Sequence, residues 1–129
     1  MIVADTDVLI DYLYGVSPVH KQVARYIDSE QLVTTAVTIF ELLSGGTEGR
    51  RGKATRGIAE LLPILALDFA SAERAASVRL LLERTGYSIN MADSLIAGIA
   101  LANDLPLLTR NRKHFSRVPQ LKLVDFQSI

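Results

Sequence analysis

The sequence predicts an α/β fold: a single three-layer domain in which a short parallel β-sheet lies between helices. Short apolar runs alternate with longer helical segments along the chain, which is typical of a parallel sheet. These runs do not alternate polar with apolar residues, so we expect both faces of the sheet to be covered. The length of 129 residues suits one domain, which we expect to span residues 1–129.

Each predicted strand is short and mostly apolar. The first is a buried strand that ends at Asp5, where the apolar run stops. In chain order, we expect strands over residues 1–4, 31–34, 64–67, 107–108 and 121–124.

Each predicted helix has apolar residues at helical spacing and recognisable end signals. Ser17 before Pro18 marks a start, Gly45-Gly46 and Gly86 mark ends, and Pro63 breaks the chain before the third strand. A polar segment, residues 47–57, and a basic one, residues 110–117, lie outside these helices. In chain order, we expect helices over residues 8–14, 17–29, 35–44, 58–62, 69–85 and 91–103.

Composition limits the kinds of site that the chain can carry. The sequence has no cysteine, which excludes disulfides, thiolate metal ligands and a cysteine nucleophile. Hydrophobic residues make up 49% and charged residues 22%, as in soluble globular proteins. No apolar run reaches the roughly 18 residues of a membrane span. Asp5, Asp7 and Asp11 argue against a signal peptide, so we expect no membrane association and a cytoplasmic location.

The net charge of zero results from 14 basic and 14 acidic residues, which at face value argues against a nucleic-acid partner. The charges are segregated, however. Residues 1–20 hold three acidic residues and no Lys or Arg, whereas residues 105–124 hold five basic residues and no acidic one. This split suits an acidic pocket beside a basic edge, so neutrality does not exclude RNA.

Polar residues gather where ligands of parallel sheets bind, beyond the carboxyl ends of the strands. Asp5, Thr6 and Asp7 follow the first strand, and Thr109, Arg110 and Asn111 follow the fourth. Glu41 lies in the helix after the second strand, and Asp93 lies in the first turn of the helix before the fourth. These residues are the candidates for chemistry.

Glu41 is the most unusual of them, because it is the only charged residue between Glu30 and Glu48. A helix that is apolar nearly all round is mostly buried. An ionised carboxylate there is costly unless a cation, a metal or several donors compensate it. The alternative is that Glu41 lies on a narrow exposed stripe.

The other carboxylates have structural alternatives too. Asp93 shares a face with small apolar residues that suit close packing, but in a first turn begun by Ser88 or Asn90 it also suits the helix dipole. Asp5 could be a strand-end turn residue and Asp7 the cap of the next helix. Asp11, one turn after Asp7, is expected to be a solvated helix residue.

Together, Asp5, Glu41 and Asp93 come from three elements expected to meet at one end of the sheet. Carboxylates close together repel, and a divalent cation relieves that repulsion. Oxygen-only ligands favour Mg²⁺ or Mn²⁺ over zinc, and such sites commonly hydrolyse phosphodiesters. His20 and His114 lack the spacing of a hydrolase triad, and neither a Gly-x-Ser-x-Gly motif nor a phosphate-binding glycine loop is present.

Four motifs resemble those of PIN-domain ribonucleases, and in particular VapC-type toxins of bacterial and archaeal toxin–antitoxin pairs. In chain order they are VADTDVLI (3–10), TIFEL (38–42), ADSLIA (92–97) and LLTRN (107–111). The resemblance covers essentially the whole chain. It implies a PIN-like fold and a metal-dependent endoribonuclease with Asp5, Glu41 and Asp93 as the acidic triad. It also implies a homodimer and a cognate antitoxin whose tail covers the active site.

The resemblance also marks supporting and divergent positions. Thr6, Asp7 and Thr109 match positions that line or support the site in the family. The family's fourth acidic position falls on Asn111, a weak metal ligand, and an Asp common just before the Phe of this segment is His114 here. The number of metal ions is therefore open.

Our hypothesis is hydrolysis of RNA by Mg²⁺ or Mn²⁺ held by Asp5, Asp93 and, directly or through water, Glu41. Attack by water would leave a 3′-hydroxyl and a 5′-phosphate. Basic side chains near the fourth strand could contact phosphates, with residues 50–56 as a second surface, although solvated loop charges are the alternative. The phosphate-contact candidates are Arg110, Arg112, Lys113 and Arg117.

Two other functions remain open at this point. Asp5 and Asp7 after a strand also resemble the first motif of haloacid-dehalogenase-type phosphatases, although their later acidic motif is missing. A non-catalytic binding module of the PIN fold is the third option, favoured only by Asn111 in place of an acid.

Overall fold

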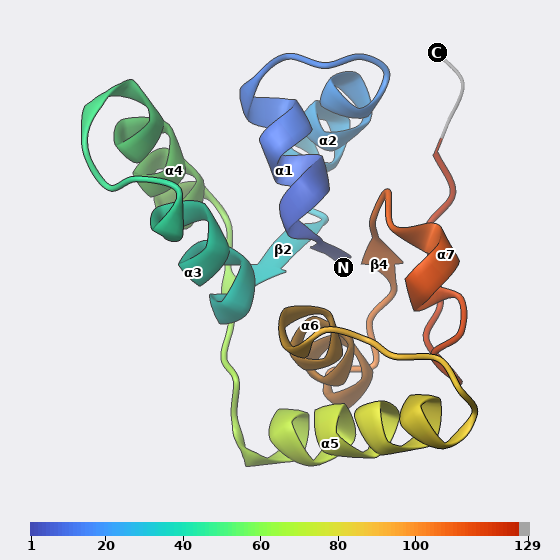
Figure 1. The fold of residues 1–129 in the computed structure, drawn as a ribbon. Coiled ribbons are helices and arrows are strands. Elements are labelled where there is room, and N and C mark those ends of the chain that lie inside the picture. The colour runs from blue at the N-terminus through green and yellow to red at the C-terminus, as the bar shows by residue number, and fades with distance from the viewer. Residues whose placement is uncertain (127–129) are drawn as a thin grey trace.

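Four short parallel strands form the centre of the computed structural model, which describes residues 1–126 (Figure 1). The strand order is β3-β2-β1-β4, and Val3 of β1 pairs with Val33 of β2 on one side and with Leu107 of β4 on the other. The predicted parallel sheet is confirmed. The strands are β1 (Ile2–Ala4), β2 (Leu32–Thr35), β3 (Ile64–Leu65) and β4 (Leu107–Leu108).

Helices cover both faces of this sheet, as predicted, and give three layers (Figure 1). None of the helices within residues 1–126 has the length and apolar character needed to cross a bilayer. The helices are α1 (Thr6–Leu13), α2 (Val19–Asp28), α3 (Ala36–Ser44), α4 (Gly49–Leu61), α5 (Phe69–Arg84), α6 (Met91–Ala102) and α7 (Arg112–Phe115).

Successive strand residues point to opposite faces, because side chains alternate along a strand. Val3 and Leu107 belong to the core cluster on the side of α5 and α6. Their neighbours Ala4 and Leu108 belong to the cluster on the side of α1, α2 and α4. Since both faces of the inner strands are buried, β1 and β4 consist of apolar residues and β2 begins with them, which is why the sequence showed no alternation.

Helices α5 and α6 pack very closely at Gly98. A Cβ at this position would lie 2.6 Å from Cβ of Ala75 and 2.5 Å from the backbone oxygen of Ser71. Only glycine fits this approach without a shift of the helices. The contact fixes α6, which carries Asp93 in its first turn.

Several predicted elements differ from the structure. Strand β3 ends at Leu65 rather than at residue 67, and residues 112–115, expected to lie outside the helices, form the short helix α7. Helix α1 begins at Thr6 rather than at residue 8, because the Asp5 side chain caps it. Helix α4 extends back to Gly49 through the polar segment, since its buried stripe consists partly of Gly52 and Thr55, which give little apolar signal. Residues 121–124 are not a strand: only a single bridge joins Leu123 to Leu107.

The strand order places one end of the sheet at a topological switch. From β1 the chain adds β2 and β3 on one side and then returns to place β4 on the other. The carboxyl ends of β1 and β4 are therefore neighbours, and Ala4 pairs with Leu108. The backbone N–H of Asp5 donates to the carbonyl of Leu108 at 3.0 Å. Ligands of parallel sheets bind at such a switch, so Asp5 and Thr109 begin the site.

Candidate functional site

Asp5 is buried at the junction of β1 and α1, with 4% of its surface exposed. One carboxylate oxygen accepts the N–H of Thr6 at 2.8 Å, which caps α1. The other accepts the hydroxyl of Thr109 at 2.6 Å. The prediction that Asp7 caps this helix was therefore wrong, because Asp5 fills that role.

Burial raises the pKa of Asp5 from 3.8 to about 7. The negative charges of Asp7 and Asp93 raise this pKa as well, whereas the hydrogen bonds from Thr109 and Thr6 lower it. Near pH 7 the protonated and the ionised forms of Asp5 are therefore similarly populated. A cation beside this carboxylate would favour the charged form and release the proton.

Asp7 connects α1 to the segment that follows β4. Its two carboxylate oxygens accept the backbone N–H of Arg110 at 3.2 and 3.1 Å, and one also accepts the Thr109 hydroxyl at 3.4 Å. Burial raises the pKa of Asp7, while the N–H and the charge of Arg110 lower it. This carboxylate therefore anchors the loop beside Asp5.

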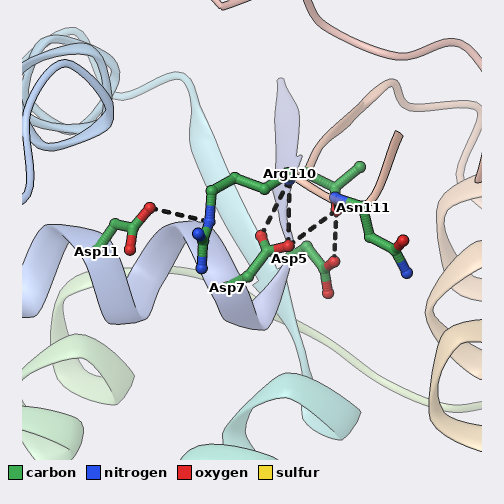
Figure 2. Close-up of polar contacts among 6 residues, drawn as sticks. Asp5, Asp7, Asp11, Arg110 and Asn111 are labelled. Carbon is green, nitrogen blue, oxygen red and sulfur yellow. Dashed lines mark hydrogen bonds and ion pairs between the residues drawn. The ribbon is translucent and has the colours of Figure 1, made fainter. Parts of the chain in front are cut away.

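Asp11 is buried, which contradicts the prediction of a solvated helix residue. Its Oδ2 atom lies 3.0 Å from Nε of Arg110, and only 8% of the Asp11 side chain is exposed (Figure 2). Arg110, expected to contact RNA, is thus already engaged within the protein. The sequence contained only a weak sign of this ion pair and none of the burial: Asp7 and Asp11 are one helical turn apart, where like charges are unfavourable.

Glu41 lies on α3 at the border of the buried face. Its Oε1 atom accepts the hydroxyl of Thr6 at 2.6 Å, and Thr38 lies within hydrogen-bond distance of the same hydroxyl at 3.3 Å. Helix α3 is not buried all round, since Phe40 is 69% exposed. The expectation that Glu41 lies in a mostly buried helix was wrong, and the alternative of an exposed stripe is closer to the structure, where Glu41 is half-buried.

Asp93 lies half-buried in the first turn of α6, which Asn90 caps as expected. The Asn90 side chain accepts the N–H of Asp93 at 2.8 Å and donates to its Oδ2 atom at 3.2 Å. Nδ2 of Asn111 also donates to this oxygen, at 3.0 Å. Burial and the charge of Glu41 raise the pKa of Asp93, whereas hydrogen bonds from Asn90 and Asn111 and the charge of His114 lower it.

The three predicted acidic residues influence one another electrostatically. Asp93 raises the pKa of Asp5, and Glu41 raises that of Asp93. However, within residues 1–126 no three His, Asp or Glu side chains gather closely enough to surround an ion. The structure therefore contains a line of interacting carboxylates and no closed cage.

The donor chemistry nevertheless fits a hard divalent cation. Mg²⁺ commonly takes only one or two protein carboxylates and keeps several waters, so a closed cage is not required. The ion pairs within residues 1–126 do not include Asp5, Glu41 or Asp93. A cation between Asp5 and Asp93 would offset charges that raise the pKa of both.

The other three basic residues predicted to contact RNA differ in their contacts within the protein. Arg112 donates to the carbonyl of Val124 at 2.8 Å and pairs with Asp125 at 3.0 Å. The Arg117 guanidinium lies 3.9 Å from the centre of the Tyr87 ring. Lys113 is exposed at the start of α7. Arg112 therefore ties down the chain near Asp125, and Lys113 and Arg117 remain at the surface.

Comparison with known proteins agrees with this arrangement. The PIN domain family model matches residues 2–121. Ribonuclease VapC10 from Mycobacterium tuberculosis is 32% identical over 122 residues, which cover 95% of this chain and 91% of the relative. Ribonuclease VapC1 from Methanocaldococcus jannaschii is 29% identical over 126 residues, covering 96% and 87%.

Solved structures show the same fold. The chain matches VapBC2 from Rickettsia felis, bound to a promoter DNA fragment, with a TM-score of 0.82 and 21% identity, covering 98% of this chain and 100% of that one. It matches FitAcB from Neisseria gonorrhoeae with a TM-score of 0.75 and 27% identity, covering 97% of each. The chain belongs to the PIN-domain family.

Proposed function

We propose that this chain is an endoribonuclease of the VapC type, the toxin of a toxin–antitoxin pair, which hydrolyses RNA phosphodiester bonds with Mg²⁺ or Mn²⁺. The observation that carries the proposal is the buried carboxylate of Asp5 at the switch between β1 and β4, whose pKa is raised mainly by burial and also by the charges of Asp7 and Asp93. Its sequence relatives named as VapC ribonucleases support the choice of RNA as the substrate.

Asp5 and Asp93, with Glu41 directly or through water, are the residues that would hold the cation. When bound, a divalent cation neutralises phosphate charge and makes water a stronger nucleophile. The chain's own residues fix the ligands in place. Thr109 holds Asp5, while Asn90 and Asn111 hold the same oxygen of Asp93.

In the proposed reaction, water attacks phosphorus opposite the 3′ oxygen. A bond forms between the water oxygen and phosphorus, and the bond between phosphorus and the 3′ oxygen breaks. The departing 3′ oxygen gains a proton, so the products carry a 3′-hydroxyl and a 5′-phosphate. Thr6 holds Glu41 at 2.6 Å, which keeps this third carboxylate oriented during the reaction.

Lys113 and Arg117 are the proposed phosphate contacts. Both belong to the segment after β4 that also contributes Thr109 and Asn111 to the site. Basic side chains bind nucleic-acid backbones by releasing counterions, so binding should weaken as salt rises. The hydrogen bonds of Arg112 to Val124 and Asp125 argue for a structural role instead.

Two hollows support the proposed protein partners. One, of about 460 Å³, combines apolar residues of α1 and α3 with Arg50 and Arg51 of α4, which suits an amphipathic acidic segment of an antitoxin. The other is almost wholly apolar and includes Phe40 and Met91, which suits the second copy of a homodimer. Relatives solved as VapBC complexes support the antitoxin. Sedimentation of the chain with and without a co-expressed antitoxin tests both partners.

The phosphatase alternative finds less support. It needs Asp7 as a mobile acid beside a nucleophilic Asp5. Both oxygens of Asp7 instead accept the N–H of Arg110, and both oxygens of Asp5 also accept hydrogen bonds. The PIN-domain match over residues 2–121 also favours the nuclease.

Cleavage of single-stranded RNA by purified protein in Mn²⁺ and in EDTA tests the proposal. Wild type and the exposed control Asp104→Asn should cut in Mn²⁺ alone, and Asp5→Asn should lose most activity. Asn suits position 104, where φ is 53°. Equal cleavage by all samples in EDTA and Mn²⁺ contradicts metal-dependent catalysis. Turnover of p-nitrophenyl phosphate that survives Asp93→Asn but not Asp7→Asn would favour the phosphatase.

A further inference from the structure

Arg110 lies along α1 and is held at two points. Its backbone N–H donates to the Asp7 carboxylate at 3.2 and 3.1 Å, and its Nε atom lies 3.0 Å from Oδ2 of Asp11 (Figure 2). Asp7 and Asp11 are one turn apart, where like charges destabilise a helix. The guanidinium also lowers the pKa of Asp7. One arginine therefore compensates two acidic residues of α1.

The residues on either side of Arg110 contact the proposed catalytic carboxylates. The Thr109 hydroxyl donates to Asp5 at 2.6 Å, and the Asn111 amide donates to Asp93 at 3.0 Å. The backbone N–H of Asn111 also donates to the Thr109 hydroxyl, at 3.0 Å. A shift of Arg110 along α1 would displace both contacts together.

The ion pair between Asp11 and Arg110 is buried on the Asp11 side. The Asp11 side chain is 8% exposed, and the removal of a carboxylate from water is costly even when it is paired. Arg110 is 53% exposed, so the pair is only partly shielded. Such a pair contributes little net stability, but it can fix a loop in one position.

We propose that Asp11 and Arg110 are positioning residues whose ion pair holds residues 109–111 against α1, so that Thr109 and Asn111 meet Asp5 and Asp93. A test by RNA cleavage rests on the proposed function, whereas a test by amide hydrogen exchange does not. The competing role is direct contact of Arg110 with an RNA phosphate.

Steady-state cleavage by Asp11→Asn and Arg110→Met separates these roles. Loss of an outer residue that orients a metal ligand typically costs about 10–100-fold, and we expect this loss in kcat for both variants. KM should change by less than about twofold, because no contact with substrate is lost. The double variant should be no worse than either single one, since both changes break one pair.

Direct phosphate contact predicts a different result. Arg110→Met would then lower the salt dependence of RNA binding by about one unit of slope, while Asp11→Asn stayed active. That outcome overturns the positioning role. Arg110→Lys should recover little activity, because an ammonium lacks the planar geometry of the guanidinium. Glu83→Gln, which breaks the exposed pair with Arg79 on α5, is the matched control and should change nothing.

Amide hydrogen exchange tests the pair without any activity. Asp11→Asn should speed exchange at the backbone N–H groups of Arg110 and Asn111 by about tenfold or more, because the loop opens more often. The sheet N–H of Val3, bonded to Pro106 at 2.9 Å, should keep its protection. Unchanged exchange at Arg110 and Asn111 overturns the proposal. If wild type cuts no RNA, only the proposed function fails, and exchange alone decides on the pair.

Discussion

Asp5 lies at the end of β1 with both carboxylate oxygens accepting hydrogen bonds, whereas Glu41 and Asp93 lie half-buried on two helices beside the sheet. We call the first region, Asp5 with Asp7 and Thr109, the strand half of the site. The second, Glu41 with Asp93, is the helix half. The strand half is fixed by the pairing of β1 with β4, and the helix half by the positions of α3 and α6.

The two halves differ in how far their carboxylates are removed from water. In the strand half, burial is the largest cause of the high pKa of Asp5, so this carboxylate is costly to ionise until a cation arrives. In the helix half, Glu41 and Asp93 are half-buried, and hydrogen bonds from Thr6, Asn90 and Asn111 orient them. We therefore expect the strand half to dominate the pH dependence of folding, and the helix half to affect cleavage more than folding.

The largest predicted effect comes from Asp5→Asn, which should separate activity from stability. Cleavage should fall by roughly 100-fold or more, because electrostatic stabilisation at the reacting centre is typically worth that much. In EDTA the same variant should be more stable than wild type at pH 8, since it removes a buried charge repelled by Asp7 and Asp93. Urea unfolding in EDTA measures this, and a lower stability would contradict the burial argument.

The pH dependence of stability should sharpen the contrast. The pKa of Asp5 is about 7 in the folded chain and near 3.8 when unfolded. As pH rises from about 4 to 7, the unfolded chain loses this proton first, so folding should weaken by up to about 4 kcal/mol and then level off. The difference between wild type and Asp5→Asn in EDTA isolates this contribution. A difference independent of pH would show that Asp5 is not desolvated.

A change in the helix half should affect activity more than folding. Glu41→Gln removes a charge that raises the pKa of Asp93 but keeps an oxygen to accept the Thr6 hydroxyl. Cleavage should fall by about 10–100-fold, as for the loss of a residue that supports a metal site. Thermal unfolding in EDTA should change little. A large loss of stability in Glu41→Gln would contradict this prediction and show that Glu41 matters for folding.

The smallest effect is expected at Thr109. Thr109→Val removes the hydroxyl that donates to Asp5 and accepts the N–H of Asn111. The pKa of Asp5 should rise further, and cleavage should fall by about tenfold with its pH profile shifted upward. Thr109→Ser keeps the hydroxyl and is the control. If the pH profile of cleavage by Thr109→Val is not shifted, the pH dependence of cleavage does not come from Asp5.

The sequence predicted the sheet well because its strands are apolar on both faces and end at polar residues. It also predicted that Asp5, Glu41 and Asp93 meet at one end of the sheet. In the structure these carboxylates affect one another's pKa, but within residues 1–126 no three acidic side chains surround a common point. The sequence could not predict the burial of Asp11. That burial depends on Arg110, which is distant in sequence and reaches α1 only because β4 pairs with β1.

Other errors have similar causes. The start of α4 was missed because small residues such as Gly52 and Thr55 form its buried stripe, and a pattern of large apolar residues does not detect them. Arg112 was expected to contact RNA because charge alone indicates a basic surface. Its actual partners, Val124 and Asp125, are set by the path of the chain after α7.

Direct titration of Mn²⁺ into the RNA-free protein tests the central claim, that the strand and helix halves hold one cation together. Wild type and the exposed control Asp104→Asn should bind Mn²⁺ with release of protons at pH 7, because Asp5 must ionise. Asp5→Asn and Asp93→Asn should each weaken binding strongly, and Asp5→Asn should also abolish the proton release. Unaltered affinity in both variants would contradict the account.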